Sequence, residues 1–238
     1  MKFTNIAKSI VSVALALTCV VFSTIPISAY NGSKAAAYAK KYATKYNNNY
    51  IEIKGGDCTN FVSQCVKEGG ISLKKIPESK IGYLNIGKVF KTEAYWDCNK
   101  HTRTVSLAGI TLHKKTGFVW TTTWSFVSRS KNGNWGFYQH MKNRGASTKE
   151  YSVSTEAKLN TFIKDCSVGD VLQVRPNTSS NKGHSVIVTD KSYDSINRRY
   201  NMKIAYHSND TAPTDFRTVS WDKFGKSRLW TIIKVSKI

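Results

Sequence analysis

Apolar residues repeat with helical spacing only near the start of this chain, whereas its last third holds short apolar runs typical of strands. One helical stripe, at spacings of i, i+3, i+4, i+7 and i+8, consists of Cys58, Phe61, Val62, Cys65 and Val66. It predicts an amphipathic helix that begins near Asp57, a favourable N-cap residue, and ends at Gly69-Gly70. A preceding helix is expected from Ser33, to be ended by Asn47-Asn48-Asn49.

The strand-like runs near the end of the chain are separated by turn-rich segments that are mostly too short for helical crossovers. The runs are 170–174, 185–189, 201–206 and 229–235. Short connections favour an antiparallel meander. Helices followed by such a sheet predict an α+β fold, with the N-terminal helices packed on the antiparallel sheet.

Residues 71–150 have a less regular pattern. Thr116 to Phe126 is aromatic and β-branched without a clear period, Asn132-Gly133 indicates a turn, and Trp135 to Arg144 indicates a short helix ended by Gly145. We interpret 71–150 as an insertion that borders a cleft, within a single domain spanning 30–238.

The first 29 residues have the layout of a secretory signal peptide. Lys2 and Lys8 precede a mostly apolar run from Ile10 to Phe22, and Ser28-Ala29 offers a cleavage point. The run is short for a bilayer-spanning helix, which needs about 20 apolar residues. An uncleaved anchor and a lipoprotein modified at Cys19 are the weaker alternatives. We expect a secreted protein, associated with the cell wall by charge, with no transmembrane anchor.

The chain is strongly basic, with a formal charge of +21. Beyond residue 29 there are 34 basic and 15 acidic residues, which gives +19. Basic residues occur as scattered pairs, so they indicate a cationic folded surface rather than a tail. Polyanions are the expected partners, and export favours anionic wall polymers over nucleic acid, for which no binding motif is visible. We expect a monomer.

The segment Gly55-Gly56-Asp57-Cys58 places a cysteine in the first turn of a helix after a flexible turn. Unpaired N–H groups and the helix dipole favour the thiolate there, which is the nucleophilic form, and a backbone N–H could bind an oxyanion. A buried structural cysteine is the alternative for Cys58, and the better interpretation for Cys65.

A cysteine nucleophile needs a base, and His184 is the best candidate, since it follows Gly183 and opens an apolar strand. A third group would orient the imidazole. His207 and Asn209, at the end of the next strand, are equal candidates, and Asp190 is expected at the far end of the His184 strand.

Asp57, Tyr50 and Asn60 are the candidates for substrate or oxyanion binding. No metal site is expected, because there is no HExxH motif and Cys98 and His101 lack a second half-site. We expect Cys98 and His101 to lie free in a loop, and the protein to need no cofactor. If Cys58 stays a thiol, at most one disulfide can form among Cys65, Cys98 and Cys166.

Several motifs together resemble the putative amidase domain of secreted bacterial proteins. These motifs are Gly55 to Cys65 (GGDCTNFVSQC), Asn49-Tyr50, Gly169 to Gln173 with Gly183 to Val188, and Tyr206 to Asp210, while Trp124 and Trp135 lie where the family has tryptophans. The resemblance covers roughly residues 33–212. It implies a papain-like fold related to CHAP-type cysteine peptidases, Cys58 as nucleophile, His184 as base, and amide bonds of cell-wall peptides as substrate.

Three functions agree with these features. The first is a secreted cysteine amidase or peptidase that cleaves peptidoglycan peptides. The second is a non-catalytic cationic protein that binds wall polymers or host glycans. The third is a secreted effector that applies the same thiol chemistry to another protein. Carboxylate pairs for glycosidase chemistry exist among the 15 acidic residues, but none lies in a motif.

Overall fold

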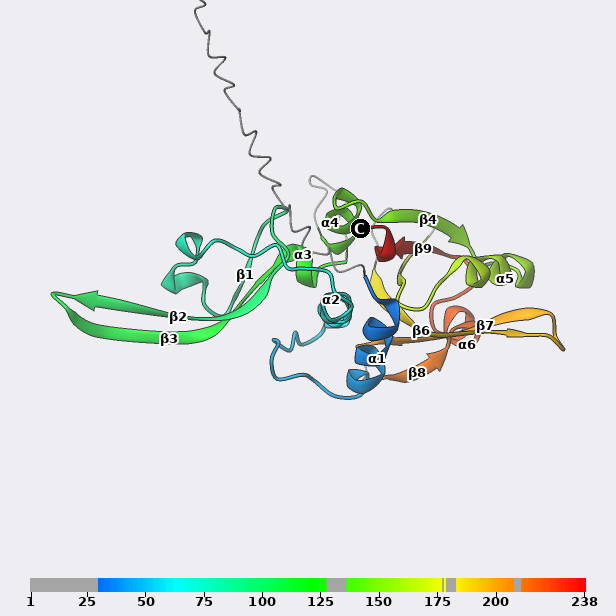
Figure 1. The fold of residues 1–238 in the computed structure, drawn as a ribbon, viewed down its shortest axis with the longest axis horizontal. Helices are drawn as coiled ribbons and strands as arrows, with labels where there is room; N and C mark the ends of the chain where they lie inside the picture. Colours follow the sequence, from blue (N-terminus) through cyan, green and yellow to red (C-terminus); the bar gives the residue numbers. More distant parts are fainter. Residues whose placement is uncertain (1–29, 128–135, 177, 179–182, 208–210) are drawn as a thin grey trace, which may run out of the picture.

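A computed structural model describes residues 30–127, 136–176, 178, 183–207 and 211–238 (Figure 1). Its helices are α1 (Gly32–Tyr42), α2 (Cys58–Glu68), α3 (Thr122–Ser125), α4 (Phe137–Asn143), α5 (Glu156–Asp165) and α6 (Phe216–Thr218). Its strands are β1 (Lys88–Phe90), β2 (Cys98–Leu107), β3 (Ile110–Thr121), β4 (Ser147–Ser152), β5 (Val171–Pro176), β6 (His184–Asp194), β7 (Arg199–Tyr206), β8 (Thr211–Asp215) and β9 (Arg228–Lys234). Helices and antiparallel strands together confirm the predicted α+β class.

The central sheet has six strands in the order β4-β9-β5-β6-β7-β8, and every neighbouring pair is antiparallel. The four predicted strands correspond to β5, β6, β7 and β9. The meander expected from short connections is confirmed for β5 to β8, but β9 returns to pair with the outer side of β5. The edge strands β4 and β8 were not predicted from the sequence, because both are short and mostly polar.

The sheet has a hydrophobic core on each face. One core joins α1 and α2 to Val171, Ile187 and Ile233 of the sheet, and the other contains α5 with Val186 and Val188. Side chains alternate along β6, so consecutive residues enter different cores. The face that a β6 residue occupies therefore decides which helices it can contact.

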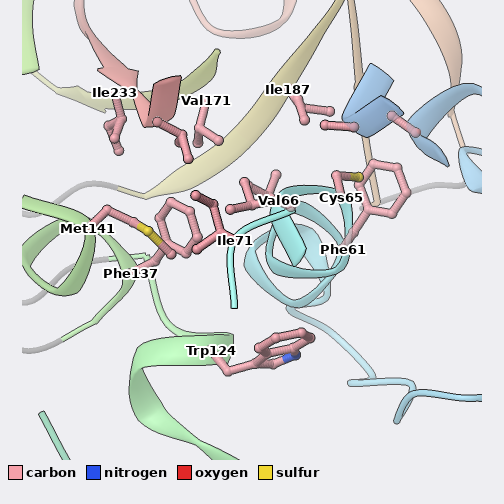
Figure 2. Packing of buried hydrophobic residues seen from close by; sticks show 14 of the residues in the cluster. Phe61, Cys65, Val66, Ile71, Trp124, Phe137, Met141, Val171, Ile187 and Ile233 are labelled. Atoms are coloured by element: carbon pink, nitrogen blue, oxygen red, sulfur yellow. The ribbon is translucent and has the colours of Figure 1, made fainter. Parts of the chain in front are cut away.

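Helix α2 lies between the sheet and Trp124, and Figure 2 shows Val171, Ile187 and Ile233 on one side of it with Trp124 on the other. All residues from Cys58 to Val66 are buried. The prediction of a helix from Asp57 to Gly69 is thus confirmed, and so is the core position of Cys65. Burial on both sides explains why the small and polar residues of α2 are enclosed together with its apolar stripe.

Helix α1 is shorter than expected. Asn31 caps it by accepting from the Lys34 backbone N–H at 2.9 Å, and the helix ends at Tyr42 rather than at Asn47. Its buried positions are alanines, which allow α1 to pack closely on α2, while Tyr46 lies beyond the helix and is exposed.

Residues 71–150 contain a second, three-stranded sheet in the order β1-β3-β2. The β2–β3 hairpin turns at Ala108 and Gly109, whose φ angles are 48° and 80°, and it extends away from the body of the protein (Figure 1). The sequence did not predict it, since polar residues occupy both of its faces. Helix α4 falls within the predicted 135–144 helix, whereas Asn132-Gly133 lies outside the described residues. Helix α5 was also not predicted.

Among the described residues, no helix is long and apolar enough to cross a membrane.

A close backbone contact joins the start of α1 to the bend before β5. Gly169 has a φ of +87°, and a Cβ added to it would lie 2.3 Å from the Gly32 Cα. We predict that Gly169→Ala lowers the free energy of unfolding by roughly 2–5 kcal/mol, because it combines backbone strain with overpacking. Urea denaturation measures this change.

Gly56→Ala is the matched control, since a Cβ there meets nothing within 4 Å. It should alter the free energy of unfolding by less than about 1 kcal/mol. Equal stabilities of the two variants would contradict the close packing of α1 on the β5 bend.

Candidate functional site

Cys58 is the first residue of α2, and its side chain is 6% exposed. Its Sγ lies 3.8 Å from Thr59 Oγ1. The Thr59 and Ser185 hydroxyl groups share a hydrogen bond of 3.0 Å, and Ser185 Oγ accepts another from Gln173 Nε2 at 3.0 Å. These contacts fix the first turn of α2 against the start of β6 and the neighbouring strand β5.

Burial raises the pKa of the Cys58 thiol. Hydrogen bonds with the Ser185 backbone and with Thr59 act in the opposite direction, but their effect is smaller. The sequence-based expectation of a stabilised thiolate considered only the helix N-terminus. In this geometry desolvation outweighs that favourable position, so Cys58 is a neutral thiol near pH 7.

Asp57 does not cap α2 with its side chain, contrary to the expectation from sequence. Its backbone is in the α region, and the carboxylate turns back toward the preceding loop. Oδ1 accepts from the Ile53 backbone N–H at 2.9 Å and from Asn60 Nδ2 at 2.7 Å. Oδ2 lies 2.8 Å from His207 Nδ1. Asp57 therefore links the loop, helix α2 and the residue that follows strand β7 at one buried point.

His207 is 1% exposed and stacks on Phe61 at a ring-centroid distance of 4.0 Å. Its Nε2 lies 2.6 Å from the Tyr42 carbonyl oxygen. A carbonyl can only accept, so Nε2 carries a hydrogen in this contact. His207 thus bridges α1 to Asp57, the residue before Cys58, and its Nε2 has no lone pair with which to act as a base.

His184 is the first residue of β6, and its ring packs against Tyr206 at 5.0 Å and Phe224 at 5.4 Å. Burial, with a smaller contribution from Lys223, lowers its pKa to about 4. Ser185 faces α2, so alternation along β6 directs His184 to the opposite face of the sheet. Cys58 and His184 both lie at the start of β6. The His184 imidazole packs against Tyr206 and Phe224, on the face of the sheet opposite to the one that carries Ser185 and the Cys58 turn.

A cavity of about 320 Å³ opens beside His184. Its lining consists of Val174, Arg175, Pro176, Gly183, His184, Lys223, Phe224 and Arg228. Arg175 is paired with Glu150 at 2.6 Å, and Lys223 Nζ donates to the Tyr206 hydroxyl at 2.9 Å. The cavity is therefore basic and partly aromatic.

Asn60 and Tyr50 have structural partners. Asn60 Nδ2 also donates to the Ile51 carbonyl at 2.6 Å, and its Oδ1 accepts from Trp124 Nε1 at 2.6 Å. Tyr50 stacks on Trp124 at 5.7 Å and donates to Glu68 at 3.2 Å. Tyr50 lines a separate cavity of about 380 Å³ between α1 and α2. Asn209 and Trp135 lie outside the described residues.

The four cysteines in the described part of the chain do not form a redox or metal site there. Cys58, Cys65, Cys98 and Cys166 are buried free thiols. Cys98 and His101 lie in strand β2 rather than in a free loop, because pairing with β3 orders this stretch. No group of metal-ligating side chains occurs among the described residues. Asp190 lies within β6, not at its end, and pairs with Lys40 at 2.5 Å.

The buried thiol leads to a prediction about reactivity. Because burial raises the Cys58 pKa above its ordinary value of 9.0, alkylation by a small neutral reagent should be slow at pH 6–7 and should accelerate only above about pH 9. Mass spectrometry of the labelled peptide measures the rate at each pH. Fast labelling of Cys58 at pH 6 would contradict the buried resting position.

The buried imidazole leads to a prediction about acid stability. The unfolded chain binds the His184 proton near pH 6.5, whereas the folded protein binds it only near pH 4. Unfolding therefore takes up a proton between these values, and stability is lost as the pH falls through this window, by at most about 3 kcal/mol. Urea denaturation of wild type and His184→Phe from pH 7 to 4 checks this: the variant should lose less stability. Parallel curves would contradict it.

Comparison with known proteins adds to this geometry. Residues 29–230 match the family described as "Putative amidase domain". A segment of 43 residues is 51% identical to uncharacterized protein YjcM of Bacillus subtilis (strain 168), which amounts to 18% of this chain and 10% of that protein. The chain thus spans about a tenth of the length of this relative. No solved structure gives a significant match. Since the family match covers most of the chain, the protein belongs to the putative amidase domain family.

Proposed function

We propose that this protein is an exported cysteine amidase or peptidase that hydrolyses amide bonds in the peptides of the bacterial cell wall. Membership of the amidase family supports a hydrolase acting on C–N bonds. The observation that carries the cysteine mechanism is the position of Cys58, the first residue of a helix fixed against the strand that begins at His184.

In this mechanism Cys58 is the nucleophile and His184 is the base. The lowered pKa leaves the His184 imidazole neutral near pH 7, so it can accept a proton. Its ring has to leave the pocket formed by Tyr206 and Phe224 to reach the thiol. His184 is the first residue of its strand and follows Gly183, where an added Cβ would meet nothing within 4 Å, so space exists for this rearrangement.

The reaction then follows thiol hydrolase chemistry. His184 takes the proton of the Cys58 thiol, and the sulfur attacks the amide carbonyl carbon. The C–N bond breaks as the imidazolium returns the proton to the leaving amine, which yields a thioester on Cys58. Water, deprotonated by His184, attacks the thioester and releases the acid and the free thiol.

Asp57 and His207 have a positioning role in this proposal. Their contact of 2.8 Å fixes the residue directly before the nucleophile, and the contact of His207 with Tyr42 connects it to α1. Neither side chain needs to touch the substrate. Asn209 is the candidate for orienting the His184 imidazole in this proposal.

The basic cavity beside His184 supports an acidic peptide as substrate. Lys223 and Arg228 border it, and their charges complement the carboxylates of wall peptides. The secretory layout of residues 1–29 and the charge of +21 agree with work at an anionic envelope. A papain-like arrangement, with the thiol helix packed on an antiparallel sheet, is part of the same proposal.

The test measures the release of amines from purified peptidoglycan by the protein and its variants. Cys58→Ala and His184→Gln should each lower the initial rate by at least about a thousandfold, as expected for the loss of a nucleophile or a base. Cys65→Ala is the matched control, since it removes a buried thiol from the same helix and should keep most of the activity.

New amines without new reducing ends would separate amide from glycoside cleavage. Undiminished release by Cys58→Ala would overturn the cysteine mechanism. Retained release by His184→Gln would overturn the role of His184 as the base.

The second candidate function is a non-catalytic cationic binding protein. The separation of the His184 ring from Cys58 and the protonated state of the thiol favour it. In that case no amine is released, and wall binding is the same in Cys58→Ala as in wild type and falls with salt. The effector alternative uses the same chemistry, and a protein substrate cleaved in place of wall peptides would identify it.

A further inference from the structure

The β2–β3 hairpin is the most isolated part of the described structure. Its strands pair with each other from Cys98↔Trp120 to Leu107↔Ile110. Strand β1 pairs only with the last three residues of β3, so the outer part of the hairpin is a two-stranded ribbon. It projects well beyond the rest of the molecule (Figure 1). A two-stranded ribbon is marginally stable by itself in water.

Large apolar side chains gather at the end of this ribbon. Leu107 is 69% exposed, Ile110 67%, Leu112 52% and Val105 40%. Leu107 and Ile110 are directly opposite each other across the turn, so their side chains share one face. A bulge between Val105 and Ser106 places Leu112 beside this pair. We call Val105, Leu107, Ile110 and Leu112 the apolar tip.

Basic residues follow immediately behind the apolar tip. Between Cys98 and Thr121 there are four basic residues and no acidic one. Lys114 pairs with Thr104, and Lys115 pairs with Arg103. Arg103 is anchored to the protein body through the Ile81 carbonyl at 2.6 Å and through Glu78, whereas Lys114 is exposed. The hairpin thus presents apolar residues first and cations next.

From this order we infer that the hairpin inserts its apolar tip into the interface of an anionic lipid bilayer. Leu107 and Thr104 are three residues apart, which at about 3.3 Å per residue sets the Lys114 level roughly 10 Å behind the tip. An interfacial segment buries its apolar part about 5–10 Å deep, so the exposed Lys114 reaches the lipid phosphates. Lys115 lies at the same level, with its Nζ over the Tyr83 ring at 5.7 Å. A dissolved polyanion would use the cations and leave the apolar tip in water. This inference does not depend on the amidase activity.

The experiment reports on the hairpin itself, in the full chain. Every labelled variant carries Cys19→Ser, so that the cysteine within residues 1–29 takes no label. Leu107→Cys is labelled with a polarity-sensitive fluorophore; the other four native cysteines are buried, which favours the new site. The labelled protein is mixed with vesicles of equal parts phosphatidylglycerol and phosphatidylcholine. The emission should shift to the blue and be quenched by lipids that carry a quencher in their acyl chains, and phosphatidylcholine vesicles should give neither effect.

Ile196→Cys is the matched control, since Ile196 is 91% exposed at the turn between β6 and β7, a different hairpin. Its label should not respond to the vesicles. Adding Lys114→Gln and Lys115→Gln to the Leu107 label should weaken the response by up to about 30-fold in lipid concentration, at about fivefold per basic residue. Residues 1–29 are present in every variant, so differences between the variants report on the hairpin.

Four outcomes would overturn the inference. The first is an unchanged Leu107 label on anionic vesicles. The second is an equal response of the Ile196 label. The third is a response of equal size to polyglycerol phosphate without lipid, which would assign the hairpin to a polymer. A blue shift that depends on protein concentration without vesicles would assign the tip to a second copy of this chain.

Discussion

The buried contact between Asp57 and His207 is the constraint on which the arrangement around Cys58 depends. One carboxylate accepts hydrogen bonds from the loop at Ile53 and from Asn60 in α2, and it contacts His207 at the end of β7. His207 in turn reaches the last residue of α1, Tyr42. A buried carboxylate is stable only with such partners, so the shape of this turn depends on the packing of α1, α2 and the sheet against one another.

The alternation of side chains along β6 decides which groups can react with Cys58. Ser185 and Ile187 face α2, while His184 and Val186 face the core that contains α5. A rearrangement at the start of β6 is therefore the structural event that separates a resting protein from an active hydrolase in our proposal. Burial, which raises the pKa of the Cys58 thiol, also makes that thiol less reactive toward oxidants.

Part of the fold could be predicted because the burial pattern is local. The stripe from Cys58 to Val66 shows helical periodicity in the sequence, because one side of α2 is apolar. Strands β5, β6, β7 and β9 are recognisable as short apolar runs, because a core covers each face of the sheet. The β2–β3 hairpin, β4 and β8 could not be predicted in this way, because exposed or edge strands carry polar residues and gain their structure from pairing. For the candidate site, sequence selected Cys58 and His184, but it assigned Asp57 to a helix cap and Asn60 to substrate.

The sequence by itself determined the α+β class, the basic composition, the family, and the placement of a cysteine at the start of a buried helix. Only the tertiary structure decided what surrounds that cysteine. Desolvation, which raises the Cys58 pKa, and the sheet face of His184 both arise from segments more than a hundred residues apart packing together. Local residue spacing does not encode long-range burial or strand register. It therefore identified Cys58 and His184, but not the raised pKa of the thiol or the sheet face of the imidazole.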